Sequence, residues 1–256
     1  MKHPSSSGRQ AWYESFFNSP DSLWLGAFPD DETSRWEAEA VAALAGLRAG
    51  QVVVDVPCGP GRHIVHWARM GCWCVGADLS ETMLEMARRR AAEEGVEVRL
   101  VRARMERLPL RSGIADAVLN LFNSFGYLDD AHNAQVLEEA ARVLKPGGVF
   151  VLDTRNPIIQ ILCAPYGEET ELADGRVFVA RAHYRRETKR LHVVWHQIDG
   201  PGRYEASIRL YSLAELEALF ERAGLEVTGT YGDFDGASFT GDEAQMILVG
   251  RTASGR

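Results

Sequence analysis

A run of valines constrains the fold of this chain more than any other feature. Residues 52–56 read Val-Val-Val-Asp-Val, and a turn rich in proline and glycine follows at residues 57–61. A continuous β-branched run predicts a strand buried on both faces, which is typical of a parallel sheet covered by helices. Residues 64–70 then predict an amphipathic helix. Strand, glycine turn and helix in this order predict a nucleotide-binding corner, because glycines allow close backbone approach and a helix start offers unpaired N–H groups.

Strands and helices continue to alternate up to about residue 153. Strands are expected at residues 72–80, 96–101, 114–122 and 149–153, and helices at residues 31–47, from the N-cap Ser80 onward, and at residues 129–144. With right-handed crossovers, this alternation predicts an α/β fold with a doubly wound parallel sheet. Ligands of such sheets bind at the carboxyl ends of the strands.

The alternation breaks in the second half of the chain. Three short strand-like runs at residues 177–184, 191–197 and 204–210 predict a small antiparallel β insertion. A helix capped by Ser212 follows, and residues 225–231 and 245–251 read as two closing strands. We therefore expect four segments: a leader and aromatic lid segment (1–30), a cofactor-binding core (31–160), a lid or substrate insertion (161–211) and the completion of the core sheet (212–256).

Composition excludes several classes of partner. The chain has 256 residues and a net charge of −8, so no global positive field favours nucleic acid or an anionic membrane. No stretch reaches the apolar length that a membrane span needs. The cysteines are Cys58, Cys72, Cys74 and Cys163, and their spacing lacks the partners of a zinc site. We expect buried, reduced thiols, a cytoplasmic location and no bound metal.

The glycine turn alone does not identify its ligand, because sites for NAD, FAD and S-adenosylmethionine share it. A dinucleotide corner needs a glycine or alanine three residues after the second glycine, and that position here is Ile64. The large side chain argues against a pyrophosphate-binding corner. Asp78, at the end of the second strand, suits a carboxylate that accepts both ribose hydroxyls, and both ligand classes use this feature.

Four motifs in order carry a family resemblance. They are Asp-Val-Pro-Cys-Gly-Pro-Gly at residues 55–61, Gly-Ala-Asp-Leu-Ser at residues 76–80, Leu-Pro at residues 108–109 and Leu-Lys-Pro-Gly-Gly at residues 144–148. Over residues 37–153 the chain resembles the class I S-adenosylmethionine-dependent methyltransferases. Residues 120–127 are also similar to a small-molecule branch that has an antiparallel lid. The resemblance implies a seven-stranded Rossmann-like sheet with the last strand antiparallel, and S-adenosyl-L-methionine as cofactor.

The resemblance also implies cofactor contacts at matched positions. Asp55 and the turn of Pro57, Cys58, Gly59 and Gly61 would hold the methionyl part of the cofactor. Asp78 would bind the ribose hydroxyls, with Leu79 against the adenine and Met105 and Glu106 on its other side. Leu121 and Phe122 would line the methionyl pocket, and Tyr13 would close over the cofactor from the N-terminal helix.

Two positions depart from the family pattern. Pro57 replaces a usual glycine and removes one backbone donor, so the remaining donors of the turn must come from residues 58–61. Arg104 replaces an aspartate that commonly accepts from the adenine amino group. Because arginine has no acceptor, Glu106 or a backbone carbonyl would have to take that bond.

Methyl transfer needs alignment and sometimes a base. His183 and His196 in the insertion and Tyr127 near a strand end are the candidate catalytic residues. The sequence therefore predicts a methyltransferase that acts on a small-molecule acceptor, with no nucleic-acid or membrane partner and an undetermined monomeric or homodimeric state. Two alternatives stay open: an NAD(P)-dependent oxidoreductase, and a non-catalytic cofactor-binding protein on the same fold.

Overall fold

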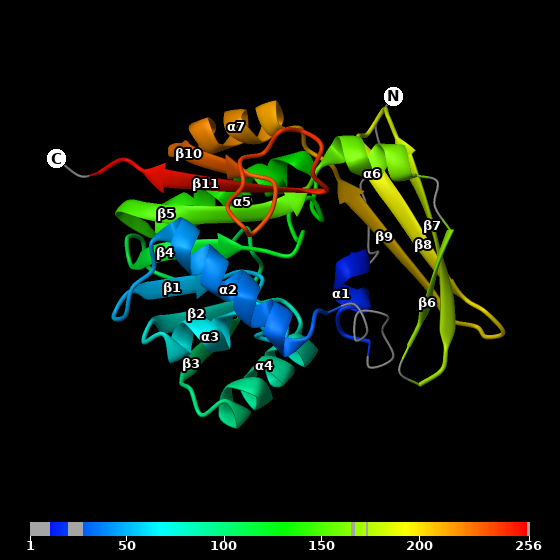
Figure 1. Ribbon diagram of the computed structural model, residues 1–256, viewed down its shortest axis with the longest axis horizontal. Coiled ribbons are helices and arrows are strands. Elements are labelled where there is room, and N and C mark those ends of the chain that lie inside the picture. Colours follow the sequence, from blue (N-terminus) through cyan, green and yellow to red (C-terminus); the bar gives the residue numbers. More distant parts are fainter. Residues whose placement is uncertain (1–10, 20–27, 165–166, 173, 255–256) are drawn as a thin grey trace, which may run out of the picture.

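The computed structural model describes residues 11–19, 28–164, 167–172 and 174–254. Its centre is a seven-stranded sheet with the order β10-β11-β5-β4-β1-β2-β3 (Figure 1). The strands are β1 (Val52–Asp55), β2 (Trp73–Asp78), β3 (Val98–Arg102), β4 (Ala115–Asn120), β5 (Leu144–Arg155), β10 (Leu225–Tyr231) and β11 (Gln245–Thr252). Strands β1 to β5 run parallel, whereas β11 is antiparallel to both neighbours, β5 and β10. This topology confirms the predicted fold class.

Helices cover both faces of this sheet and complete a three-layer domain. Helices α2 (Asp31–Ala45) and α3 (Ile64–Arg69) bury residues such as Val41 and Trp67 against one face. Helices α5 (Asp130–Val143) and α7 (Leu213–Arg222) bury Leu137 and Phe220 against the other. Helix α4 (Glu81–Glu93) packs along β2 and β3. The alternation of inward and outward side chains in β1 sends Val53 to the first face and Val54 to the second, as a doubly covered strand requires.

Local capping explains where several helices begin. The Ser80 hydroxyl accepts from the Met83 backbone N–H and starts α4, as the sequence predicts. Helix α7 starts with a capping box, in which Ser212 and Glu215 each accept from the other's backbone N–H.

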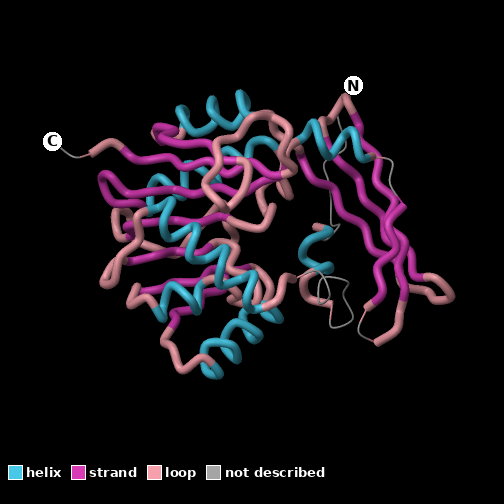
Figure 2. Tube along the Cα trace, viewed as in Figure 1, coloured by secondary structure: helices cyan, strands magenta, loops and turns pink. Residues whose placement is uncertain are grey.

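A second, four-stranded antiparallel sheet stands across the carboxyl ends of the parallel strands (Figure 2). It contains β6 (Gly167–Glu171), β7 (Val177–Arg185), β8 (Arg190–Gln197) and β9 (Arg203–Arg209). We call it the lid sheet. The short helix α1 (Trp12–Phe16) packs against β9, and α6 (Pro157–Cys163) connects β5 to the lid sheet.

Several details differ from the sequence expectation. The insertion has four strands, because the acidic run of β6 pairs with β7 although it lacks the apolar alternation that would reveal a strand. Helix α6 was also not expected. Strand β5 begins at Leu144, so the predicted turn at residues 145–148 lies inside its bounds, with Gly147 at φ 74°. Cys163 is exposed, which corrects the expectation that all four thiols are buried.

The sequence also predicts an N-terminal leader, no membrane span and no bound metal. The predicted leader at residues 1–10 lies outside the described ranges. No helix in the described part of the chain is long and apolar enough to cross a membrane. Within those same ranges, no group of three or more His, Cys, Asp or Glu side chains is arranged to hold a metal ion.

Candidate active site

A cavity of about 300 Å³ lies between the carboxyl edge of the seven-stranded sheet and the lid sheet. Its floor comes from the loops after β1, β2, β3 and β4, and its roof from α1, β6, β8 and β9. The predicted cofactor-binding residues that line it are Tyr13, Asp55, Pro57, Cys58, Gly59, Asp78, Leu79, Met105, Glu106, Leu121 and Phe122. The topology brings these residues together because the carboxyl ends of parallel strands meet at one edge.

Gly61 is the predicted cofactor residue that does not line the cavity. A Cβ at this position would lie 3.0 Å from the Cβ of Ala87, so the glycine instead allows the turn to pass close to α4. Its φ of 77° also favours glycine. The structure thus assigns Gly61 to packing and turn geometry.

Asp78 ends β2 with its carboxylate beside the glycine turn. One carboxylate oxygen accepts from the Gly59 backbone N–H at 2.9 Å, and the other accepts from the Ser80 N–H at 2.8 Å. The residue is only 8% exposed, and burial raises the pKa of its carboxyl to about 6 against the opposing effect of these two hydrogen bonds. Burial likewise raises the pKa of Asp55 to about 8. Two carboxyl groups beside the turn are therefore buried, and burial disfavours their charged forms. Such shifted pKa values are typical of ligand-binding and catalytic sites.

A buried polar cluster, which none of the sequence motifs predicts, supports the turn from α2. Arg62 donates to Glu37 and lies over the Phe122 ring, with 4.5 Å from its Cζ to the ring centroid. His63 contacts the same Glu37 carboxylate at 2.7 Å, and burial lowers the pKa of His63 to about 4, so the imidazole is neutral near pH 7 and donates. Burial tends to raise the pKa of Glu37, but the hydrogen bond from His63 and the charge of Arg62 outweigh it. The sequence feature that pointed to this cluster was Glu37, a charged residue among the buried positions of α2.

Arg104 fastens α1 to the loop after β3. Its guanidinium donates to Glu106 at 2.7 Å, to Glu14 at 3.1 Å and to the Tyr13 hydroxyl at 3.1 Å. Arginine at position 104, where the family commonly has aspartate, thus has a structural role, because it joins the N-terminal helix to the cavity rim. Glu106 already accepts from Arg104 in this arrangement.

Replacing Arg104 with glutamine should loosen α1. Loss of partly exposed ion pairs costs about 1 kcal/mol, which corresponds to about a fivefold larger population of the locally open state and hence faster amide exchange. Hydrogen–deuterium exchange of the amides of residues 13–17 measures this change. Arg99→Gln removes the same charge from an exposed position on β3 and serves as the control. Equal exchange in the two variants would contradict a fastening role for Arg104.

Aromatic side chains from α1 and from its C-cap residue, Phe17, form the roof of the cavity around Tyr127. The Trp12 ring centroid lies 4.8 Å from that of Tyr127, and Tyr13 and Phe17 stack on Tyr127 at 6.3 and 6.0 Å. Phe16 extends the cluster to Trp195 of β8 at 5.7 Å. Tyr127 therefore lies in the cavity, as predicted from its place near a strand end. Burial raises its pKa to about 12, so it is not a base near neutral pH.

The expectation that His183 or His196 supplies a base requires correction. Neither lines the cavity, and both side chains are exposed. Ala180 and Ala182 of β7 face the core while His183 points to the opposite face, where it stacks on His192 at 5.3 Å. His196 lies on that same outer face of β8. The two-residue alternation of a strand separates these histidines from the site, and this alternation was visible in the sequence.

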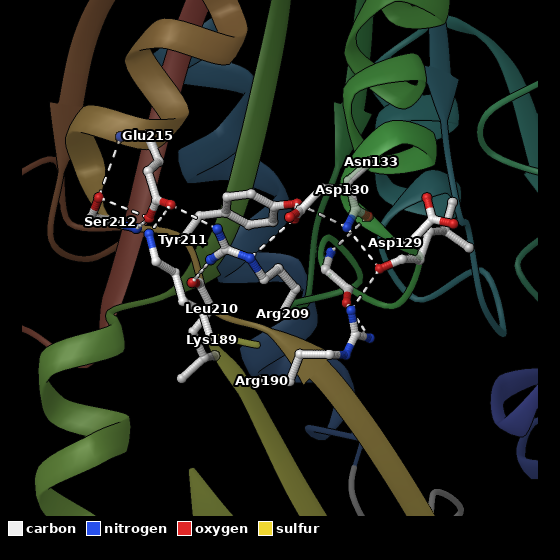
Figure 3. A network of polar contacts seen from close by, with 12 residues as sticks. Asp129, Asp130, Asn133, Lys189, Arg190, Arg209, Leu210, Tyr211, Ser212 and Glu215 are labelled. Atoms are coloured by element: carbon white, nitrogen blue, oxygen red, sulfur yellow. Dashed lines mark hydrogen bonds and ion pairs between the residues drawn. The ribbon is translucent and has the colours of Figure 1, made fainter. Parts of the chain in front are cut away.

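A polar network joins the lid sheet to the loop that carries Tyr127 (Figure 3). The guanidinium of Arg190 donates to the carbonyls of Gly126, Tyr127 and Leu128 at 3.2, 3.2 and 2.9 Å. Nearby, Arg209 is 7% exposed and pairs with Asp130 and Glu215 at 3.0 and 2.7 Å. These bonds hold the lid sheet, α5 and α7 in one arrangement around the cavity.

Comparison with known proteins identifies the class of fold that carries this site. Residues 53–148 match the family described as "Methyltransferase domain". A demethylmenaquinone methyltransferase of Mycobacterium sp. (strain JLS) is 38% identical over 117 residues, which is 46% of this chain and 46% of that protein. The chain thus aligns with about half the length of this curated relative.

Solved structures match over most of the chain. The CcbJ methyltransferase of Streptomyces caelestis has a TM-score of 0.78 and 26% identity, covering 94% of this chain and 99% of that one. DesVI of Streptomyces venezuelae has a TM-score of 0.63 and 28% identity, covering 90% and 95%. These two matches cover 94% and 90% of this chain, so they extend well beyond residues 53–148.

Proposed function

Because this chain carries a methyltransferase domain on the class I S-adenosylmethionine-dependent fold, we propose that it is an enzyme that transfers a methyl group from S-adenosylmethionine to a small-molecule acceptor. The observation that carries the proposal is the position of the Asp78 carboxylate, beside the glycine turn and at the cavity wall. The cofactor would supply a methyl group on a sulfonium centre. Asp78 and the turn after β1 would hold this cofactor beside the acceptor, which would take the methyl group from the sulfonium sulfur and release a proton.

In this proposal the protein contributes binding and alignment. Asp78 accepts from the ribose hydroxyls, Leu79 and Met105 enclose the adenine, and Leu121 and Phe122 border the methionyl part. Residues 31–160 and 212–256 form the cofactor-binding unit, and residues 161–211 face the acceptor. Tyr13 and Tyr127 close the roof and exclude water, which favours alignment of the reacting atoms.

The oxidoreductase alternative is not favoured. The curated relative and the CcbJ structure described above are named methyltransferases, and Ile64 is fully buried where a dinucleotide corner needs a small residue. A non-catalytic binding protein stays distinguishable by experiment, because it would bind the cofactor without methylating any acceptor.

Thermal unfolding with S-adenosylmethionine, S-adenosylhomocysteine and NAD tests the proposed function. A ligand at about 100 times its dissociation constant stabilises the native state by about 2.7 kcal/mol, or about 5–10 °C for a domain of this size. We expect this shift with both adenosyl compounds and none with NAD. A shift with NAD alone would support the oxidoreductase instead.

Cofactor affinity should fall in acid because Asp78 must be ionised to accept two hydroxyl hydrogens. Burial raises its pKa to about 6, so affinity is constant above about pH 7 and falls about tenfold per pH unit well below pH 6. The raised pKa also means that the unbound native state holds this proton more tightly than the unfolded chain. Its contribution to stability therefore decreases as pH rises from the ordinary value of 3.8 toward 6.

Calorimetric titration with S-adenosylhomocysteine from pH 5 to pH 8 measures this dependence. Asp153→Asn is the matched control, because the pKa of Asp153 is also raised by burial, to about 7, but its carboxylate accepts from the Phe122 N–H and does not line the cavity. The control should keep the acid fall. A flat profile in the unmodified protein would contradict the assigned role of Asp78.

A further inference from the structure

Arg155 is the cavity arginine whose charge is not matched by a carboxylate. Of the other two arginines that line the cavity, Arg62 pairs with Glu37 and Arg104 pairs with Glu14 and Glu106. Arg155, the last residue of β5, has no carboxylate within 4 Å in the described part of the chain, and its Nη1 donates to Gln160 at 3.3 Å. Its Nε is buried without a hydrogen-bond partner among the described residues. A buried, charged donor without a partner is costly, and a ligand that enters the cavity can supply one.

The neighbouring carboxyl group, that of Asp153, forms no ion pair with Arg155 within 4 Å among the interactions of the described residues, although the charge of Arg155 tends to lower its pKa. Asp153 is 1% exposed, one of its oxygens accepts from the Phe122 N–H at 2.9 Å, and Gln245 donates to the other at 3.5 Å. Burial raises the pKa of Asp153 to about 7, so its carboxyl is partly protonated near neutral pH. The positive charge of Arg155 therefore remains available to the cavity.

Two further polar atoms at the same cavity lack partners in the described structure. They are the indole Nε1 of Trp12, a donor, and the Oδ1 of Asn123, an acceptor. Asn123 is held at φ 60°, a left-handed backbone that suits its side chain. Trp12 contacts Tyr127, with 4.8 Å between the ring centroids, and Arg155 lines the same cavity as these two residues. None of these three residues is needed for the cofactor contacts proposed above.

The remainder of this part of the cavity is mainly apolar. Trp195 of β8 and Ala206 and Ile208 of β9 line it from the lid sheet, and Phe16 of α1 and the next residue, Phe17, line it from the N-terminal side. A ligand that is complementary to this lining has an apolar body and a few polar atoms at one end. The positive charge of Arg155 would repel an ammonium group at that end of the ligand. An anionic oxygen at the same place would pair with Arg155.

We propose that Arg155 binds a carboxylate of the methyl acceptor, so that the acceptor is a small acid with an apolar, ring-sized body. The Trp12 N–H is the second donor to this end of the acceptor, and the Asn123 carbonyl oxygen accepts from an N–H or O–H of the acceptor. This assignment rests on the proposed function, since it takes the part of the cavity that the cofactor leaves. It makes Arg155 a specificity-determining residue and gives β5 and α1 a shared role in substrate choice.

Equilibrium binding to the full chain saturated with S-adenosylhomocysteine tests the assignment. The probes are phenylacetate and indole-3-acetate, each compared with its primary amide and with the amines phenethylamine and tryptamine. Charged hydrogen bonds of about 1.5–3 kcal/mol correspond to at least tenfold tighter binding of an acid than of its amide. Arg155→Gln should abolish this preference, and Arg155→Lys should retain part of it because the charge remains. Arg35→Gln, at an exposed position on α2, should leave the preference unchanged.

The outcomes separate this assignment from the proposed function. Amides or amines that bind as tightly as the acids, a preference that survives Arg155→Gln, or no binding of either acid at millimolar concentration would each overturn it while S-adenosylhomocysteine still binds. Failure to bind S-adenosylhomocysteine would overturn the proposed function instead. Unchanged affinity of Arg155→Gln for S-adenosylhomocysteine shows that the variant is folded and that its cofactor site is intact.

Discussion

Replacing Asp78 with alanine is expected to weaken binding of S-adenosylmethionine by at least about 100-fold. In the proposed complex the carboxylate accepts from two ribose hydroxyls, and each charged hydrogen bond contributes about 1.5–3 kcal/mol. Loss of both amounts to at least about 3 kcal/mol, or slightly more than a factor of 100. The unbound protein should tolerate the change, because the buried carboxylate is itself costly, as its raised pKa of about 6 indicates.

Calorimetric titration of the variant with S-adenosylmethionine measures this loss. Glu81→Ala is the control, because Glu81 is an exposed carboxylate three residues away, in the first turn of α4. It should bind with nearly unchanged affinity. Asp78→Asn should resemble the alanine variant, since an amide accepts at only one of its two polar atoms. An affinity of Asp78→Ala within about threefold of the unmodified protein (about 0.6 kcal/mol) would contradict the assigned role.

Replacing Gly126 with alanine should destabilise the protein by about 3–5 kcal/mol. The residue has φ 101°, and a Cβ would lie 2.3 Å from the Arg209 carbonyl oxygen. This contact involves backbone on both sides, so no side-chain rotation relieves it. The Arg209 N–H also donates to the Gly126 carbonyl at 2.8 Å, and movement of the loop would break that bond. Strain at such a backbone position together with a clash belongs to the most damaging classes of single substitution.

Thermal unfolding should therefore show a decrease of about 10 °C or more for Gly126→Ala. Gly113→Ala is the matched control, because Gly113 also has positive φ, at 68°, but no atom lies within 4 Å of its added Cβ. It should cost about 1 kcal/mol from backbone strain alone. Equal losses in both variants would show that the close approach of residues 126 and 209 is unimportant. The Gly126 variant should also disturb Tyr127, because Arg190 holds the same loop through three carbonyls.

Features encoded within short segments were predictable. The valine run of β1, the Ser80 and Ser212 caps and the alternation of strand and helix each depend on neighbours in sequence, so they predict elements without knowledge of the whole. Parallel strands also place their carboxyl ends at one edge, whatever the details of packing. For this reason Asp55 and Asp78 could be assigned to one cavity from the sequence alone.

Features that depend on distant segments were not predictable in the same way. The cluster of Glu37, Arg62 and His63 joins α2 to the turn after β1, and only the packed structure shows that these polar groups are buried together. Arg104 reads as a lost adenine contact in the sequence, but the structure shows that it binds Tyr13 and Glu14 of α1. The pairing of β6 likewise depends on β7, because its own residues carry no strand pattern.

The sequence by itself thus determined the core sheet, its ligand-binding edge and the class of enzyme that the chain resembles. Only the tertiary structure decided which side chains of the lid sheet and of α1 enter the cavity. The physical reason is that periodicity defines two faces of a strand but not where a separate sheet is placed, which is why His183 and His196 proved to be outside. Asn123 lies in the family-like stretch at residues 120–127, whereas no motif marks Trp12 or Arg155. The importance of all three follows from burial of polar atoms without partners in the described structure, which is a property of the folded chain.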